Sequence, residues 1–577
     1  MKNNYVLGLN FLHSDSSACL FENNELVVAA EEERFLRVKH TTLFPFNAIK
    51  FCLSHVNINI SDISVITINS RPTSSIIKKI LFLLQNPSAY KIAINSAKNT
   101  QSKLTLKKYI SKIDENHNFN GKIFYADHHK SHIASSLYFS DFEECVNLSV
   151  DGFGDFASCA WGYSKNKNLK LDSKIYFPHS LGIYYQAMTQ FLGFKNYGDE
   201  YKVMGLSPYG KPKYIKEISN LINKTDFGFN LNLKYFEHHK KKILQINKNN
   251  QAEYLNLYSN KLVDLLGRAR TNNDEITQYH MDLAKSIQSV YEDIFFHLLN
   301  IVYRKYQNPN LTLSGGCAMN SVANGKIIKK TPFKNIYISP NPGDGGGSVG
   351  SACAYLSNKF KKKIYVKNYS YLGPKFNNDE IENIKNKFEY KKKYNINFLK
   401  DQEVSSYIAK ELANSKVIGW FQDKTEWGPR ALGNRSILAD PRNSNIKKII
   451  NSKIKRRESF RPFAPSVIFE EAHKWFDINK EIPFMSEVYQ VRKEKQKLLP
   501  GITHIDGSGR VQTVKKEDNF KYYNLIRNFF ELTNVPVILN TSFNENEPIV
   551  NHPIEALNCF HRTEMDILVL ENYILSR

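Results

Sequence analysis

The chain has 577 residues, a formal net charge of +23 at neutral pH, 42% hydrophobic residues and 23% charged residues. These values are typical of a globular protein with two or more domains, and they exclude a fibrous or largely disordered chain. Most of the positive excess is lysine interleaved with asparagine and isoleucine, so compositional bias explains it as well as a binding groove does. A nucleic-acid partner is therefore not expected.

Seven scattered cysteines, none in a Cys-x-x-Cys pair, predict a reducing compartment without structural zinc. The residues after Met1 lack the roughly 7–15 apolar positions of a signal peptide. No stretch approaches the ~20 apolar residues that a membrane span requires. The sequence thus predicts a cytoplasmic protein without a membrane span.

A pattern of strand, polar turn and strand occurs twice along the first part of the chain. Strands are predicted at 6–10, 18–21 and 26–30, and again at 146–150 and 157–163. The repetition favours two related lobes with a ligand between them. This is the plan of the actin, sugar-kinase and heat-shock-chaperone class of nucleotide-binding folds.

His128 and His132 stand four residues apart and share one face if their segment is helical. Two imidazoles one turn apart can hold a divalent metal. A polar helix edge with satisfied histidines is the alternative, and this segment alone leaves it open. A zinc protease is not expected, because His129 occupies the position of the glutamate base.

Two glycine-rich loops follow an amphipathic helix predicted over 282–303. The loops, 314–320 and 341–350, each come after a strand and before a helix, where a backbone can approach phosphates closely. Tight turns would also need these glycines, but two such loops in series favour nucleotide binding. The lysine- and asparagine-rich stretch 216–260 has weak periodicity and is interpreted as an insertion or mobile surface.

Residues 359–370 are interpreted as a linker between a first domain, 1–358, and a second, 371–577. The second domain places arginines among glycine, proline and small residues. Planar guanidinium groups suit a phosphate or carboxylate that is held at two points. Pairing of these arginines with Glu426, Glu458 and Asp506 is the alternative for any one of them.

Several long strings together resemble the O-carbamoyltransferases of the nodulation-protein U and antibiotic-tailoring group. The resemblance extends over nearly the whole chain, with no recognised motif in about 215–275. It is carried by 31–35, 37–40, 128–132, 151–155, 202–210, both glycine-rich loops, and the C-terminal strings 426–438, 455–465, 504–512 and 539–544.

The resemblance implies an α/β fold. The first domain is then a two-lobed actin-like (ASKHA) domain, similar to the tRNA threonylcarbamoyl-transfer protein. The second is an α+β YrdC-like domain, similar to the adenylate-forming partner in that pathway. Carbamoyl phosphate and ATP would give carbamoyl-adenylate and pyrophosphate in the C-terminal domain, and a hydroxyl of a sugar or natural product would attack the intermediate in the N-terminal domain.

The resemblance also implies site residues. The metal ligands would be His128, His132, Asp151 and Asp344, with iron(II) as the expected ion. Nucleotide-binding positions would be Lys39, Asp151, Gly152, Gly154, Asp155, Gly316, Asn320 and Gly345. The carbamoyl-phosphate pocket would contain Arg430, Arg461, Arg510 and Asn540, with Lys455 as an additional phosphate contact.

His13 and Asp15 lie in the first predicted turn, which faces the cleft between the lobes in a two-lobed fold. A histidine with a pKa near neutrality suits a general base for the acceptor hydroxyl. The alternative is a histidine that only structures the turn. Expected partners are ATP, carbamoyl phosphate and the acceptor, and the formation of a homodimer is left open.

Three other functions are compatible with parts of the sequence. A tRNA N6-threonylcarbamoyladenosine-type transferase would share the N-terminal plan, but the 426–438 string argues against it. A non-catalytic nucleotide-binding protein would be expected to lose part of the metal and phosphate residues. A sugar kinase would leave residues 371–577 unexplained.

Overall fold

The computed structural model divides into two compact units, Met1–Lys367 and Asn368–Arg577. The division falls within the segment 359–370 that the sequence marks as a linker, of which 361–363 lie outside the described residues. The predicted domain boundaries at 358 and 371 stay predictions. The structure describes residues 4–71, 73–86, 106–114, 116, 118–241, 243–247, 251–360 and 364–577.

The first sheet of the N-terminal unit has the order β15-β3-β2-β1-β4-β5. Its first three strands form an antiparallel meander, and β4 and β5 run parallel to β1. The predicted strands 18–21 and 26–30 pair as an antiparallel hairpin, because Asn23 and Asn24 give a tight polar turn between two apolar runs. The bounds are β1 Tyr5–Asn10, β2 Ser17–Glu22, β3 Glu25–Glu31, β4 Ile63–Ile68, β5 Lys122–Tyr125 and β15 Tyr365–Val366.

The second sheet repeats this arrangement with the order β14-β13-β6-β7-β8. Here β6, β7 and β8 form the antiparallel meander, and β13 and β14 run parallel to β6. Strand order and strand directions therefore match those of β3-β2-β1-β4-β5, which confirms the predicted duplication into two lobes. The bounds are β6 Glu144–Gly154, β7 Ala157–Lys165, β8 Asn168–Tyr176, β13 Asn310–Ser314 and β14 Asn335–Ile338.

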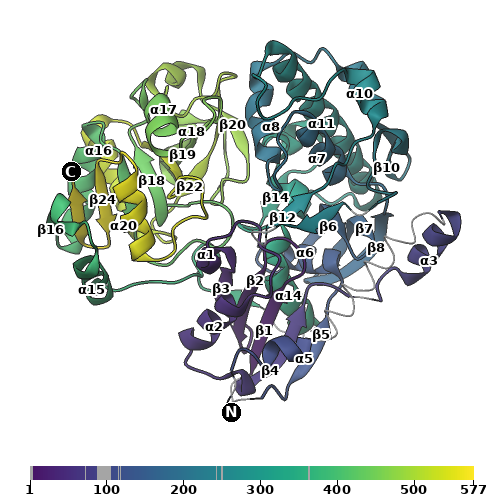
Figure 1. The fold of residues 1–577 in the computed structure, drawn as a ribbon, viewed down its shortest axis with the longest axis horizontal. Helices are drawn as coiled ribbons and strands as arrows, with labels where there is room; N and C mark the ends of the chain where they lie inside the picture. The colour runs from purple at the N-terminus through teal and green to yellow at the C-terminus, as the bar shows by residue number, and fades with distance from the viewer. Residues whose placement is uncertain are drawn as a thin grey trace. The chain divides into compact units, whose positions relative to one another are not determined.

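Two helices connect the lobes: α6 (His128–Leu137) and α14 (Gly347–Phe360). Helix α14 packs on β1 and β4 of the first sheet, α6 packs on β6 and β13 of the second, and the two helices pack on each other. Figure 1 shows both helices in the middle of this unit. The loops that lead into α6 and α14 are thereby brought together, although more than 200 residues of chain separate them.

The remaining helices of this unit include the predicted amphipathic helix, which runs as α11 (Gln278–Tyr306). The stretch 216–260 contains short hairpins, β9–β10 and β11–β12, whose three or four residues are too few to give a visible period. Their bounds are β9 Ile222–Thr225, β10 Gly228–Leu231, β11 Leu244–Ile246 and β12 Ala252–Tyr254. The other helices are α1 Glu33–Leu36, α2 Phe46–His55, α3 Ile76–Gln85, α5 Leu106–Ile110, α7 Leu181–Phe191, α8 Glu200–Leu206, α9 Ile215–Ser219, α10 Asn260–Leu266, α12 Ser321–Asn324 and α13 Ile327–Lys330.

The C-terminal unit is an eight-stranded mixed sheet with the order β16-β25-β24-β17-β18-β23-β19-β22. Its strands are β16 Asn395–Phe398, β17 Ile418–Phe421, β18 Arg435–Ala439, β19 Ala464–Ile468, β22 Gln512–Val514, β23 Val537–Ser542, β24 Ile567–Leu570 and β25 Tyr573–Ser576, with a separate hairpin of β20 Val488–Gln490 and β21 Ser508–Arg510. Its helices are α15 Asn378–Lys387, α16 Asp401–Ala413, α17 Ile446–Ile449, α18 Phe469–Trp475, α19 Phe520–Thr533 and α20 Pro553–Arg562. The predicted α/β class, with a two-lobed first unit and an α+β second unit, is confirmed.

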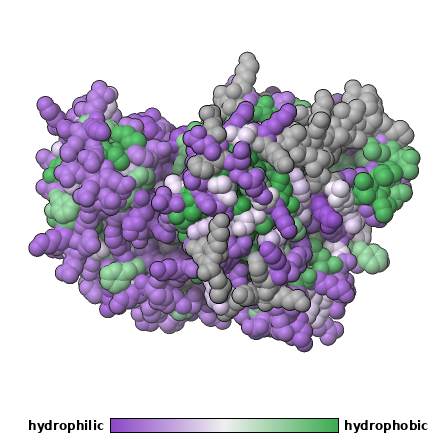
Figure 2. All heavy atoms as spheres, turned by 90° about the horizontal axis from the view of Figure 1, so that it is seen from below, coloured by the Kyte–Doolittle hydropathy of each residue, from purple (hydrophilic) through white to green (hydrophobic). Residues whose placement is uncertain are grey.

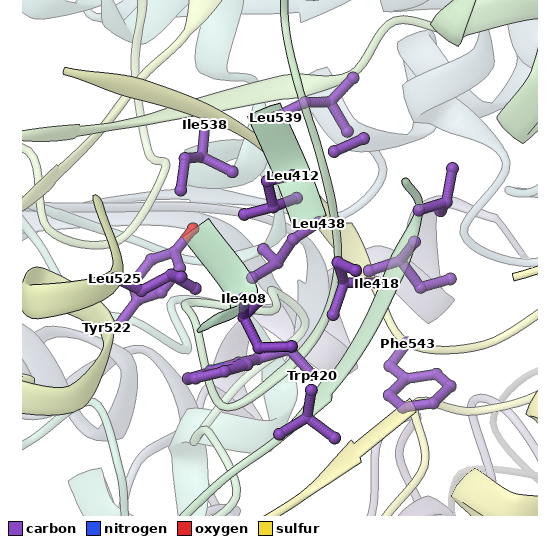
Figure 3. Packing of buried hydrophobic residues seen from close by; sticks show 14 of the residues in the cluster. Ile408, Leu412, Ile418, Trp420, Leu438, Tyr522, Leu525, Ile538, Leu539 and Phe543 are labelled. Atoms are coloured by element: carbon purple, nitrogen blue, oxygen red, sulfur yellow. The ribbon is translucent and has the colours of Figure 1, made fainter. Parts of the chain in front are cut away.

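The core of this unit lies between the sheet and the helices α16 and α19. Figure 3 shows Ile408 and Leu412 of α16 and Leu525 of α19 among side chains of the central strands. Each such aliphatic side chain contributes about 1.5–3 kcal/mol when fully buried. Trp420 adds a hydrogen bond from its Nε1 to the carbonyl of Gly433 at 2.9 Å, which ties the core to the loop that carries Arg430.

Candidate functional site

Helix α6 begins at the paired histidines because Asp127 caps it. The Asp127 side chain accepts a hydrogen bond from the Lys130 amide at 3.1 Å, which satisfies one free donor of the first turn. His128 and His132 follow on one face and are both fully buried. The helical spacing predicted from the sequence is therefore confirmed.

Two aspartates complete the cluster around these histidines: Asp151, near the end of β6, and Asp344, in the glycine-rich segment after β14. His128 Nε2 lies 3.0 Å from His132 Nε2 and 3.1 Å from Asp151 Oδ2. Asp344 Oδ1 lies 3.4 Å from His132 Nε2 and 3.7 Å from His128 Nε2. One ligand atom from each of the four side chains lies within 4.8 Å of every other. The structure thus brings together all four residues predicted as metal ligands.

Neighbouring groups fix these ligands in place. The Gly316 amide donates to Asp151 Oδ1 and the Ser14 hydroxyl to Asp344 Oδ2, each at 2.8 Å. Gly154 packs directly against the His128 ring, and a Cβ at this position would lie only 1.9 Å from the imidazole. The glycine is therefore required for the histidine to occupy its position.

The buried carboxylates of the cluster need a compensating positive charge. Burial alone would lower the pKa of His132, but the neighbouring carboxylates of Asp151 and Asp344 raise it to about 10. Burial likewise opposes ionisation of Asp151, yet the two histidines hold the pKa of that carboxyl well below its usual range. Here a proton compensates the buried carboxylates, and a metal cation would serve the same purpose.

The donor set fits a divalent metal ion. Asp344 Oδ1 is buried and makes no hydrogen bond, although it points at the two Nε2 atoms. Two imidazole nitrogens and two carboxylate oxygens form a mixed set that suits iron, manganese or zinc without selecting one of them.

His13 and Asp15, the predicted catalytic pair, take separate positions beside this cluster. The ring centroid of His13 lies 5.2 Å from that of His128. Asp15 instead pairs with His40, whose Nδ1 lies 2.7 Å from Asp15 Oδ1. Burial opposes the charge on His40, but Asp15 and Glu33 raise its pKa to about 9. Sequence reasoning missed His40, although it directly follows the predicted Lys39.

Two tyrosines near the cluster were not predicted from the sequence. The Tyr197 hydroxyl lies 2.5 Å from Ser14 Oγ, and its ring stacks on Tyr254 at 5.3 Å. A Cβ on Gly152 would meet Tyr254 Oη at 4.0 Å. Tyr254 belongs to β12, in the stretch where the sequence shows no recognised motif, so no signal along the chain marked it.

The other residues predicted to bind nucleotide lie around the same turns. Lys39 lies beside Glu33 and His40 and influences the pKa of both. Asn320 caps α12 through the Ala323 amide and exchanges hydrogen bonds with Gln288. The Gly345 carbonyl accepts a hydrogen bond from Ser17. Their contacts with a nucleotide stay predictions.

Asp155 makes three hydrogen bonds within the protein. Its carboxylate accepts from the Ser70 hydroxyl and the Arg71 amide, each at 2.8 Å, and from the His128 amide at 2.9 Å. It therefore ties the end of β4 to the start of α6. A nucleotide contact, which the sequence predicted for Asp155, would compete with these bonds.

Four arginines of the C-terminal unit form a positively charged cluster. Burial is the first cause that lowers the pKa of Arg510, and the charges of Arg430, Arg457 and Arg461 lower it further, to well below its usual range. The Arg510 Nε is buried without a hydrogen-bond partner. Sequence reasoning predicted three of these arginines and missed Arg457, which is held by Asn451 Oδ1 at 2.8 Å. Such a cluster is stabilised by a bound anion.

The carboxylates offered as alternative partners are mostly used elsewhere. Glu426 Oε1 accepts from the amides of Leu432, Asn434 and Arg435, which shapes the loop that carries Arg430. Asp506 accepts from the Ser508 amide and hydroxyl. Glu458 does pair with Arg461, at 3.5 Å, so the alternative applies to that one arginine.

Asn540 and Lys455 differ in how much of their bonding capacity the protein uses. The Asn540 amide donates to Ala431, Ser466 and Gln512, while its Oδ1 is buried without a hydrogen bond. Lys455 is buried, and its ammonium contacts four oxygens of Ser542 and Asn544. It secures that turn, and a direct phosphate contact would compete with these bonds.

Comparison with known proteins covers both units. A family model described as Carbamoyltransferase N-terminus matches residues 5–353, and one described as Carbamoyltransferase C-terminus matches 409–577. An uncharacterised protein of Synechocystis is 39% identical, covering 99% of this chain and 97% of its own. Nodulation protein NolNO of Sinorhizobium fredii is 33% identical, covering 100% and 81%. A 3'-hydroxymethylcephem-O-carbamoyltransferase of Amycolatopsis lactamdurans is 33% identical over 45% of this chain and 47% of its own.

Proposed function

Because the chain belongs to the carbamoyltransferase family, we propose that it is an ATP-dependent O-carbamoyltransferase that works in two steps. In the first, carbamoyl phosphate, ATP and water give carbamoyl-adenylate, with release of phosphate and pyrophosphate. In the second, the hydroxyl of a sugar or natural-product acceptor attacks the carbamoyl carbon, the C–O bond to AMP breaks, and AMP leaves. The product is a carbamate ester.

The arginine cluster is the observation that carries this proposal. Arg430, Arg457 and Arg461 lie near enough to the buried Arg510 for their charges to lower its pKa, and a multiply charged anion such as carbamoyl phosphate would offset this positive charge. The unpaired Asn540 Oδ1 is an acceptor that suits the amine of the carbamoyl group. Together these groups orient both ends of the same small molecule.

The histidine–aspartate cluster of the N-terminal unit supports the second step. A divalent metal held by His128, His132, Asp151 and Asp344 would supply Lewis-acid stabilisation of the phosphate that leaves with AMP. His13 lies next to His128 and is the proposed base that takes the proton of the acceptor hydroxyl. Asp15, in the same turn as His13, pairs with His40.

The first step is tested by following pyrophosphate and labelled carbamoyl-adenylate after incubation with carbamoyl phosphate, ATP and magnesium. We expect Arg430→Ala to lower pyrophosphate release by about 100-fold or more, because a forked phosphate contact is lost. Arg527→Ala is the matched control, since this exposed arginine of α19 contacts Glu531 and the Phe530 ring. Full activity of Arg430→Ala would remove the arginine cluster from the mechanism.

A further inference from the structure

Helix α3 presents its apolar side to solvent. No residue of this helix is buried, and Ile76, Ile77, Ile80, Leu81 and Leu84 are between 45% and 72% exposed. These positions recur at helical spacing and fall on one continuous face. We call these five side chains the α3 face. Figure 2 shows them as a green patch at the right edge of the molecule, where Figure 1 places α3.

The side of α3 opposite this face packs against other residues of the N-terminal unit. Phe82 packs edge-on against Phe177, with ring centroids 4.9 Å apart, and against Phe156 at 5.8 Å. The Lys78 ammonium lies 5.4 Å from the centre of the Tyr176 ring. The orientation is thus fixed by contacts on the inner side, and within the described part of the N-terminal unit the α3 face stays exposed.

The chain around α3 is strongly basic. Residues 63–113 contain nine lysines and arginines and no aspartate or glutamate, whereas 56 acidic residues in 577 would put about five into a segment of this length. Compositional bias toward lysine does not by itself remove acidic residues. The cations are Arg71, Lys78, Lys79, Lys91, Lys98, Lys103, Lys107, Lys108 and Lys112.

We propose that the α3 face docks the protein reversibly on an anionic lipid bilayer. Aliphatic side chains of this size insert at the boundary between headgroups and acyl chains, and neighbouring lysines and arginines are attracted by the negative surface potential. Among the described residues, no helix has the length and apolarity to cross a bilayer, so α3 would lie in the interface. This inference goes beyond the proposed function and does not depend on it.

The bilayer explains both features of the surface. A second copy of this chain would bring Arg71, Lys78 and Lys79 against the same three cations, which opposes association. A nucleic acid would use the cations, but it would leave five aliphatic side chains against water, since bases stack on aromatic rings. An anionic bilayer uses the charges and covers the aliphatic side chains.

Cosedimentation with vesicles tests the proposal on the full chain. We expect binding to phosphatidylcholine vesicles that contain phosphatidylglycerol, and weak binding to pure phosphatidylcholine. Ile77→Ser with Leu84→Ser should lower the partition coefficient by about tenfold or more, because both are among the most exposed side chains of α3. Phe227→Ser with Ile215→Ser is the matched control, since these are exposed apolar residues on other elements. A Leu84→Trp variant should also show a blue shift of its fluorescence with anionic vesicles.

Several results would contradict docking on a bilayer, and each points to a different explanation of the surface. Absence of binding to the anionic vesicles, or equal binding of the α3 variant and the wild type, overturns the proposal. Concentration-dependent dimerisation that the α3 variant abolishes, without vesicle binding, assigns the face to a second copy. Salt-sensitive binding to nucleic acid that the serine substitutions leave unchanged assigns the cations to that partner. Carbamoyl-adenylate formation by the α3 variant should equal that of the wild type in every case.

Discussion

Gly154 sets the position of His128, because no side chain fits between this backbone and the imidazole. Replacing Gly154 by alanine should displace the ring and weaken metal binding by about 10–100-fold, as for other residues that orient metal ligands. Calorimetric titration with iron(II) under anaerobic conditions measures the effect. Gly152→Ala is the control, since its Cβ would meet Tyr254 Oη only at 4.0 Å. Equal affinities of the two variants would contradict this role of Gly154.

His40 should make the stability of the protein depend on pH. Burial lowers its pKa, but Asp15 and Glu33 raise the folded-state value to about 9, above the usual 6.5. A raised folded-state pKa stabilises the protein below about pH 6.5, and this stabilisation is lost as the pH rises through 9. The difference in Tm between the wild type and His40→Gln should therefore be largest at pH 6 and shrink by pH 10. A difference that stays constant over this range would contradict the assignment.

The residues that sequence reasoning missed share one property. His40 meets Asp15, Tyr254 approaches Gly152, and Arg457 acts on Arg510, each through contacts between distant parts of the chain. No spacing rule along the sequence reports such contacts. The paired histidines of α6 were predictable because four residues make one helical turn.

Helix α6 depends on Asp155. Its carboxylate accepts hydrogen bonds from the amide of His128, the first residue of α6, and from the hydroxyl of Ser70, just after β4. Asp155→Ala would leave three donors unsatisfied and remove a negative charge from a helix N-terminus. We expect a loss of about 1–3 kcal/mol in the free energy of unfolding. Urea unfolding measures it, with Asp264→Ala as the control because that carboxylate is exposed in a weak surface pair.

An unchanged urea midpoint for Asp155→Ala would show that other contacts hold α6.

The strands and hairpins were predictable at this scale, since apolar alternation and polar turns mark them directly. The short hairpins β9–β10 and β11–β12 were not, because strands of three or four residues show too little pattern.

At the scale of the whole molecule, the duplicated strand order explains where the first site lies. Both sheets place a parallel strand next to a meander, and Asp151 near the end of β6 and Asp344 in the segment after β14 come together there. The repeated pattern in the sequence indicated this plan. The second unit has its own sheet and core, and its arginine cluster belongs to that unit alone.

The proposed function assigns carbamoyl-adenylate formation to the C-terminal unit and carbamoyl transfer to the N-terminal unit. Pyrophosphate release and bound carbamoyl-adenylate, measured side by side for Arg430→Ala and His132→Ala, test it most directly. We expect Arg430→Ala to form no carbamoyl-adenylate. His132→Ala, which removes one of the four proposed metal ligands, should release pyrophosphate at a rate within about threefold of the wild type and accumulate carbamoyl-adenylate, since only the transfer step is expected to depend on this residue. Loss of pyrophosphate release in His132→Ala to the same extent as in Arg430→Ala would contradict the division into two steps.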